Sequence, residues 1–213
     1  MGVRVNVGCG ITPTPGWINL DNSPSVLIAN WHLLANTLLR MPFLPPDRRK
    51  FISEAITQRI RFASAIKLPC PDGSVEIIYS SHMMEHLHRA DAALFLQEAR
   101  RVLAPDGIIR LALPDLRRLA AAYIDDGDAD AFVESTFLVP DRAKSKKYQL
   151  FSFIWGERHH QWMYDGASLV KMLTDHGFRD AQMLEAGKTT IADPGVLNLA
   201  ERIAESVYVE ARR

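Results

Sequence analysis

Short apolar runs alternate with helical segments along most of this 213-residue chain, and this alternation limits the possible folds more than any other feature. The runs have the length of β-strands, and turns rich in glycine and proline separate them from segments with helical spacing. We expect strands over residues 3–7, 17–20, 61–66, 75–79, 108–113 and 206–211. Strands that alternate with helices predict an α/β domain with a mainly parallel sheet, because parallel neighbours need a long crossover that is usually a helix.

A periodic apolar stripe predicts a helix over residues 25–41. Its apolar residues recur at alternating steps of four and three, as one face of a helix requires. They are Leu27, Trp31, Leu34, Leu38 and Met41. Such a stripe has to be buried, and a lid over the active site, a homodimer contact and packing on the sheet are all open. We favour packing on the sheet with partial cover of the substrate.

Further helices are expected over residues 47–60, 90–103 and 167–176, and most of 115–155 has a helical pattern. We therefore predict a single domain over residues 1–213. It contains a helical insertion at about 22–60 and a mostly helical segment at about 115–165.

The composition of the chain limits the partners that it would bind and the cellular compartment that we expect for it. The chain has 25 basic and 25 acidic residues, so no overall field draws it to nucleic acid or to an anionic membrane. Two cysteines, Cys9 and Cys70, do not make a disulfide framework in a chain of this length, which favours a reducing compartment. The first ten residues lack the layout of a signal peptide, and no apolar run reaches the roughly 18 residues of a membrane span. We expect a cytoplasmic protein without a membrane span.

The ends of the first two expected strands carry residues that suit a nucleotide. Ligands of parallel sheets bind beyond the carboxyl ends of the strands. Gly8 and Gly10 allow the backbone to approach a ligand closely, and Asp21 can accept hydrogen bonds from a ribose diol. The third glycine of a G-x-G-x-x-G fingerprint is missing, because Ile11, Thr12 and Pro13 follow Gly10. An adenosine-containing cofactor is therefore favoured over a nicotinamide dinucleotide.

Several segments occur in a specific order. They are VNVGCG at 5–10, GWINLD at 16–21, LPCPDGSV at 68–75, YSSHMMEHL at 79–87 and RVLAPDG at 101–107. Together they resemble the class I S-adenosylmethionine-dependent methyltransferases, most of all small bacterial methyltransferase-11-like members with G-W-I-N-x-D and S-S-H-x-x-E-H-L segments. HHQWMYD at 159–165 and ESVYVEA at 205–211 are also similar to that subgroup.

The resemblance implies a Rossmann-like, mainly parallel seven-stranded sheet flanked by helices, with S-adenosyl-L-methionine as cofactor. Gly8, Cys9 and Gly10 would lie against the methionine and ribose parts, Asp21 would bind the ribose hydroxyls, Ser64 and Ala65 would flank the adenine, and Ser80, Ser81 and His82 would face the methionine part and the substrate. Only residues 11–16 separate the first two strands, so the usual helix between them must be reduced or lost.

The expected reaction is methyl transfer to an oxygen or nitrogen of a small molecule, a sugar or glycan precursor, or a peptide natural product. A hydroxyl acceptor needs a base, and His82 and His160 are the candidates, with His159 beside the latter. An amine acceptor needs little beyond positioning.

Two other classes remain open. The segment HMMEH at 82–86 matches the H-x-x-E-H pattern of zinc hydrolases. In that interpretation His82 and His86 would bind zinc, and Glu85 would activate water. No downstream ligand motif stands out, although Glu98 and the His159–His160 pair are candidates, so we expect no metal. The second alternative is a non-catalytic scaffold of the methyltransferase fold.

Overall fold

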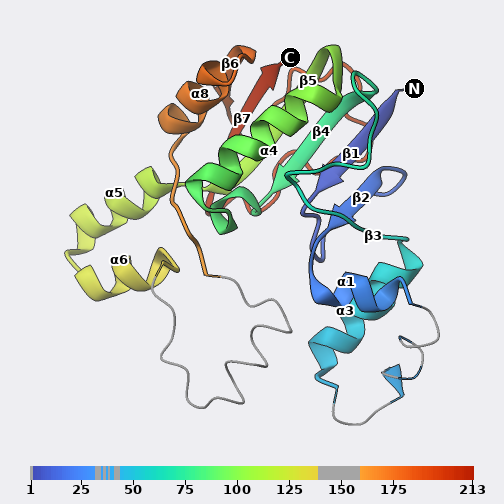
Figure 1. The fold of residues 1–213 in the computed structure, drawn as a ribbon. Coiled ribbons are helices and arrows are strands. Elements are labelled where there is room, and N and C mark those ends of the chain that lie inside the picture. Colours follow the sequence, from blue (N-terminus) through green and yellow to red (C-terminus); the bar gives the residue numbers. More distant parts are fainter. Residues whose placement is uncertain (1, 32–34, 36, 38, 41–43, 139–158) are drawn as a thin grey trace.

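The computed structural model describes the chain except for residues 1, 32–34, 36, 38, 41–43 and 139–158 (Figure 1). The strands are β1 (Val3–Val7), β2 (Ile18–Asp21), β3 (Arg61–Phe62), β4 (Val75–Ser81), β5 (Leu103–Pro114), β6 (Arg179–Leu184) and β7 (Ser206–Arg212). The helices are α1 (Pro24–Ala29), α3 (Pro46–Thr57), the short 3₁₀ helix η1 (Met84–His86), α4 (Arg89–Val102), α5 (Leu116–Asp126), α6 (Ala129–Ser135) and α8 (Gly166–Asp175).

All seven strands form one twisted sheet in the order β3-β2-β1-β4-β5-β7-β6. The first five are mutually parallel, whereas β7 runs antiparallel to both β5 and β6. The chain therefore has the predicted α/β fold with a mainly parallel seven-stranded sheet. The expected loss of the helix between the first two strands is also confirmed, because residues 11–17 contain only turns and irregular backbone.

Two sequence expectations were incomplete or wrong. The seventh strand, β6, was not located in the sequence, because it is an edge strand whose side chains are mostly exposed and whose pattern is polar. The continuous helix over 25–41 is wrong: α1 ends at Ala29, and the side-chain amide of Asn30 donates to the carbonyl of Val26 at 2.8 Å. Leu27 and Trp31, the first stripe residues, are exposed, whereas Leu34, Leu38 and Met41 lie outside the described residues.

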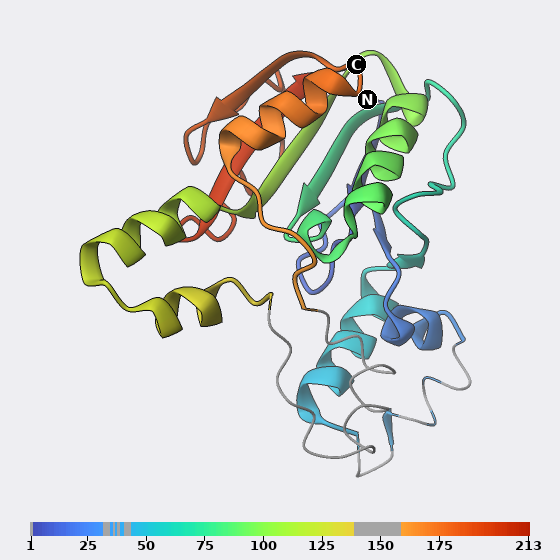
Figure 2. The same cartoon turned by 60° about the vertical axis from the view of Figure 1, so that its left-hand side comes forward.

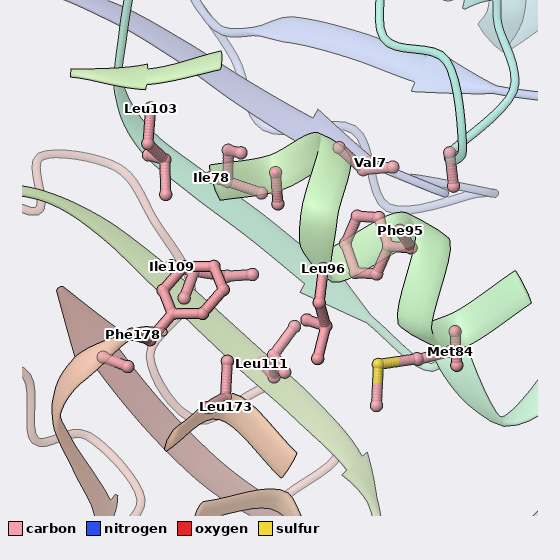
Figure 3. Packing of buried hydrophobic residues seen from close by; sticks show 14 of the residues in the cluster. Val7, Ile78, Met84, Phe95, Leu96, Leu103, Ile109, Leu111, Leu173 and Phe178 are labelled. Carbon is pink, nitrogen blue, oxygen red and sulfur yellow. The ribbon is translucent and has the colours of Figure 1, made fainter. Parts of the chain in front are cut away.

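Helices α4 and α8 cover one face of the sheet (Figures 1 and 2). Phe95 and Leu96 of α4 and Leu173 of α8 lie in one buried cluster with Val7, Ile78, Ile109 and Leu111 of the sheet (Figure 3). These side chains are buried, and removal of apolar area from water is the main favourable term of folding. The packing fixes the carboxyl ends of β4 and β5 against α4.

The opposite face of β4, β5 and β7 packs against the segment between β6 and β7. Its Ile191 and Leu197 contribute to a cluster with Tyr79 and Tyr208. The segment is linked to the sheet through Arg110, which donates to the carbonyls of Lys188 at 3.0 Å and Leu199 at 2.8 Å.

Arg110 forms a buried ion pair with Glu210 at 2.6 Å, and both side chains are almost fully excluded from solvent. Glu210 also accepts hydrogen bonds from the Thr189 hydroxyl at 2.6 Å and from the Thr190 amide and hydroxyl at 2.7 and 2.6 Å. Burial alone would raise the pKa of Glu210, but the hydrogen bonds from Thr189, Thr190 and Arg110 hold it below the ordinary value. The two charges thus compensate each other, and both carboxylate oxygens of Glu210 accept hydrogen bonds.

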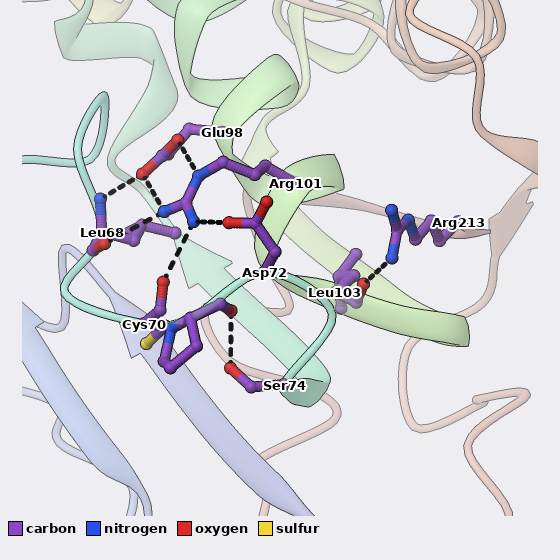
Figure 4. A network of polar contacts seen from close by, with 9 residues as sticks. Leu68, Cys70, Asp72, Ser74, Glu98, Arg101, Leu103 and Arg213 are labelled. Carbon is purple, nitrogen blue, oxygen red and sulfur yellow. Dashed lines mark hydrogen bonds and ion pairs between the residues drawn. The ribbon is translucent and has the colours of Figure 1, made fainter.

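A second polar network fixes the loop that enters β4 (Figure 4). Arg101 of α4 binds Glu98 at 2.7 Å, forms an ion pair with Asp72, and donates to the Cys70 carbonyl at 3.2 Å. Glu98 in turn accepts from the Leu68 amide at 2.7 Å. The loop beside the expected adenine end of the site is therefore held against α4.

The turn after β1 is constrained by Gly8, which has φ +69°. A Cβ atom at this position would overlap the side chain of Met83, whereas Gly10, with φ +48°, has open space around its Cα. Only Gly8 therefore needs glycine both for its backbone conformation and for packing.

We predict that Arg110→Met lowers the free energy of unfolding by about 3–5 kcal/mol, because it leaves Glu210 buried without its cation. Urea denaturation followed by circular dichroism measures the change. Arg179→Met is the matched control, because its pair with Asp106 is exposed and should contribute under about 1 kcal/mol. Equal losses in the two variants would contradict the role given to the buried pair.

We also predict that Gly8→Ala destabilises the protein more than Gly10→Ala. Both variants place a side chain in the left-handed region, at roughly 1–2 kcal/mol. Gly8→Ala adds overlap with Met83, at roughly 1–3 kcal/mol. The same denaturation measurement distinguishes them, and Met83→Gly introduced into Gly8→Ala should recover part of the difference, because both the Cβ and the Cγ of Met83 lie in the overlap. A double variant no more stable than Gly8→Ala would show that the overlap is not the cause.

Candidate active site

The turn after β1 and the end of β2 are joined by the Asp21 carboxylate. One of its oxygens accepts from the Gly10 amide at 3.0 Å, and the other accepts from the Ser23 amide at 2.7 Å. The amides of Gly8 and Cys9 both donate to the Leu20 carbonyl, at 2.8 and 3.1 Å. The expected cofactor residues Gly8, Cys9, Gly10 and Asp21 are therefore adjacent.

Within this group, Cys9 is buried and Asp21 is partly exposed. Burial, followed by the nearby charge of Asp21, raises the pKa of the Cys9 thiol far above its ordinary value. Cys9 is therefore not a nucleophile at neutral pH. Each Asp21 oxygen keeps a second lone pair that can accept from a hydroxyl.

The expected adenine residues follow β3 at the same edge of the sheet. Backbone pairing continues past β3, because the Ala63 amide donates to the Asp21 carbonyl at 3.0 Å. Ser64 then begins a tight turn closed by the Lys67 amide, which donates to its carbonyl at 3.1 Å, and Ala65 inside this turn is buried. Both residues thus lie directly after the strand next to β2.

The end of β4 lies next to the end of β1. The Ser80 hydroxyl donates to the Val7 carbonyl at 2.9 Å, and Ser80 and Ser81 are both buried. The amide of His82 continues the pairing with β5 by donating to the Ala112 carbonyl at 2.9 Å. The Ser80 side chain therefore binds the backbone of β1. Ser81 and His82 lie at the point where the chain leaves the sheet.

His82 is held by contacts on both ring nitrogens. Arg202 lies 3.2 Å from Nδ1, and the Ser206 hydroxyl lies 2.8 Å from Nε2. Because the guanidinium can only donate, Nδ1 accepts and Nε2–H donates to Ser206. Burial, followed by the charge of Arg202, lowers the pKa of His82 to about 3. His82 is therefore a neutral imidazole whose lone pair is directed at Arg202.

Glu85 stands between the two histidines that were expected to be catalytic. Its Oε1 lies 3.5 Å from His82 Nδ1 and 4.0 Å from His160 Nε2. Burial raises the pKa of Glu85 to about 8. Burial also lowers the pKa of His160. The structure thus brings His82 and His160 close to one carboxyl group, although neither Glu85 oxygen has a hydrogen-bond partner in the described chain.

The zinc interpretation of HMMEH places His82 and His86 on one face of a helix, and the structure does not form that helix. His82 has φ +47° and lies in a bend after β4, and the helical backbone that follows is only η1. His82 and His86 therefore do not share the face of an α-helix, which the H-x-x-E-H interpretation assumed. The physical cause is the tight exit from β4, where His82 still pairs with β5 through its amide.

Arg202 and Ser206 were missed in the sequence as partners of His82. They are more than a hundred residues away along the chain, and no local spacing connects them to the β4 exit. The pairing arises because β7 lies beside β5. Glu85 was visible in the H-x-x-E-H pattern, but its contact with His160 was not.

Comparison with known proteins gives one family match. A family model described as a methyltransferase domain matches residues 43–111, which contain β4, α4 and most of β5. A protein of Mycolicibacterium smegmatis, described as a probable S-adenosylmethionine-dependent methyltransferase, is 38% identical over 56 residues. That match covers 26% of this chain and 21% of the relative, so the chain spans about a fifth of the relative's length.

Two solved structures are also similar. A protein of Pyrococcus horikoshii OT3 has a TM-score of 0.50 at 15% identity, over 99% of this chain and 81% of that one. A S-adenosylmethionine-dependent methyltransferase of Mesorhizobium loti has a TM-score of 0.47 at 17% identity, over 100% and 91%. At such identities the first likeness concerns the fold alone.

In the described part of the chain, no helix has the length and apolarity that crossing a membrane requires. The family match, the M. smegmatis relative and the seven-stranded sheet agree with one another. Residues 43–111 thus match a methyltransferase domain, and the chain is similar to S-adenosylmethionine-dependent methyltransferases.

Proposed function

We propose that this protein, as a single domain, transfers a methyl group from S-adenosylmethionine to an oxygen or nitrogen of a small molecule, a sugar or glycan precursor, or a peptide natural product. The observation that carries the proposal is the contact of the Gly8–Gly10 turn with Asp21 at the β1–β4 switch point. The sheet order reverses there, since β2 and β3 extend to one side of β1 and β4 and β5 to the other. Ligands of such sheets bind at this point.

The residues present fit an adenosine-containing cofactor. Gly10 leaves open space where a side chain would stand, so a ligand can approach its backbone. Asp21 is partly exposed and retains acceptor capacity for a ribose diol. Ser64 and Ala65 follow the neighbouring strand and would flank the adenine, while Ser81 and His82 would face the methionine part.

S-adenosylmethionine supplies an activated methyl group on a sulfonium sulfur, so the protein has to position the acceptor and exclude water. The acceptor side of the proposed site is the group around His82, Glu85 and His160. We assign a positioning role to His82, because both of its ring nitrogens have partners. Within this group, we assign the direct contact with the methyl acceptor to His160.

We predict that S-adenosylhomocysteine binds the wild type with a micromolar or tighter dissociation constant. Asp21→Ala should weaken binding by about 1–3 kcal/mol, the usual cost of an unpaired polar group. Isothermal titration calorimetry measures both constants. Asp175→Ala is the matched control, because this exposed residue of α8 pairs only with Lys171 among the contacts of the described chain and should leave affinity unchanged.

Absence of binding to folded wild type would overturn the cofactor assignment and favour a non-catalytic scaffold. Equal weakening by Asp21→Ala and Asp175→Ala would show that the β2 carboxylate is not the ribose contact. Circular dichroism of each variant confirms that the comparison is made on folded protein.

A further inference from the structure

We propose that Glu85, His86 and His160 form a binding site for a divalent transition metal. This site would lie beside the proposed cofactor site, on the side where the methyl acceptor binds. The inference rests on the proposed methyl transfer and narrows its acceptor to a hydroxyl group. It differs from the H-x-x-E-H interpretation in its ligands, because His160 replaces His82 and no α-helix is involved.

The three side chains converge in space. One potential ligand atom from each lies within 4.8 Å of the others. Metal–ligand distances of about 2.1 Å in a tetrahedral site place ligand atoms roughly 3.4 Å apart, so small side-chain rotations would close the set. The imidazoles of His86 and His160 stand edge to face with ring centroids 5.0 Å apart, so the rings do not block each other.

The Glu85 carboxylate is the strongest sign that a cation belongs here. Its side chain is 1% exposed, and neither oxygen has a hydrogen-bond partner on another residue of the described chain. An ionised carboxylate buried without compensation costs several kcal/mol, so the Glu85 carboxyl group needs either a proton or a nearby cation, and buried charges are normally paired or bound to a metal. The same carboxylate oxygen lies 4.0 Å from His160 Nε2. A metal between them would satisfy both groups.

The histidines are oriented by backbone carbonyls in the way that metal ligands are. His160 Nδ1 lies 2.7 Å from the Thr136 carbonyl, and His86 Nδ1 lies 3.4 Å from the His159 carbonyl. A carbonyl can only accept, so Nδ1 carries the proton and Nε2 carries the lone pair. Such a hydrogen bond on the far nitrogen fixes the tautomer and the ring orientation of a metal ligand.

The backbone also fixes His160 relative to Glu85. The amides of Gln161 and Trp162 donate to the Glu85 carbonyl at 2.7 and 3.2 Å. The His160 amide donates to the Phe137 carbonyl at 3.0 Å. The segment that carries His160 is thereby held between η1 and the residues that follow α6.

Two imidazoles and one carboxylate suit a first-row divalent metal such as Zn²⁺ and leave positions for an external ligand. A hydroxyl acceptor bound there would lose its proton to solvent more readily, because the metal lowers its pKa. Its oxygen then forms a bond to the methyl carbon, and the carbon–sulfur bond breaks. The electron pair stays on sulfur, which leaves as the neutral thioether of S-adenosylhomocysteine. In this arrangement His160 is a metal ligand rather than the base.

The test is a calorimetric titration of Zn²⁺ into the chelator-treated full chain, with Co²⁺ absorption as a second readout of coordination. We expect one equivalent bound with a micromolar or tighter dissociation constant. Glu85→Gln and His160→Ala should each weaken Zn²⁺ binding by at least tenfold and reduce the Co²⁺ visible bands. His88→Ala is the matched control, because this exposed residue lies two positions from His86 but outside the cluster.

S-adenosylhomocysteine titrated into the same samples separates the two proposals. Cofactor binding without stoichiometric Zn²⁺ binding would overturn the metal site and leave the methyltransferase proposal standing. Zn²⁺ binding lost in Glu85→Gln, with no cofactor binding, would support the metal site and overturn the proposed reaction. Equal Zn²⁺ affinity in wild type and Glu85→Gln would also overturn the metal site. Should Glu85→Gln not fold, His86→Ala replaces it, with thermal unfolding as the check.

Discussion

The parallel pairing of β1 with both β2 and β4 is the constraint on which the candidate site depends. In this register Val7 pairs with Leu20, while the Ser80 hydroxyl reaches the Val7 carbonyl from β4. Three strand exits therefore meet at one edge, although they are up to about seventy residues apart in sequence. The chain then turns tightly at Gly8, just after the end of β1, and remains at this edge of the sheet. That pairing positions the candidate cofactor residues at the ends of β1, β2 and β4.

Much of this edge could be predicted from the sequence, because buried parallel strands are continuous apolar runs and their ends are marked by glycine and aspartate. β6 could not, since an exposed edge strand has no such run. The break after Ala29 was hidden as well, because the apolar period continues past Asn30 while the backbone does not. The approach of Glu85 to His160 spans 75 residues of chain, and only tertiary packing creates it. Local spacing therefore predicts the strand exits and fails where distant segments meet.

Two buried glutamates show how differently one fold treats the same chemical group. Glu210 is surrounded by Arg110 and two threonines, and its pKa is held low. Glu85 has no such donors among the described residues, and burial raises its pKa to about 8. A buried carboxyl group with donors around it keeps its charge, whereas one without them takes up a proton at neutral pH and remains an unsatisfied polar group, which persists where function requires it. Glu85 lies just after the end of β4, beside the proposed cofactor site, where a function for such an unsatisfied group is expected.

The segment between β6 and β7 couples the back of the sheet to the chemistry at its edge. Near its start it is anchored by Arg110, and at its end it presents Arg202, while Ser206 follows as the first residue of β7. A substitution that shifts this segment would move Arg202, and with it the donor that faces His82 Nδ1, while Ser206 stays paired with β5. The segment therefore gives the back of the sheet a mechanical connection to the exit of β4.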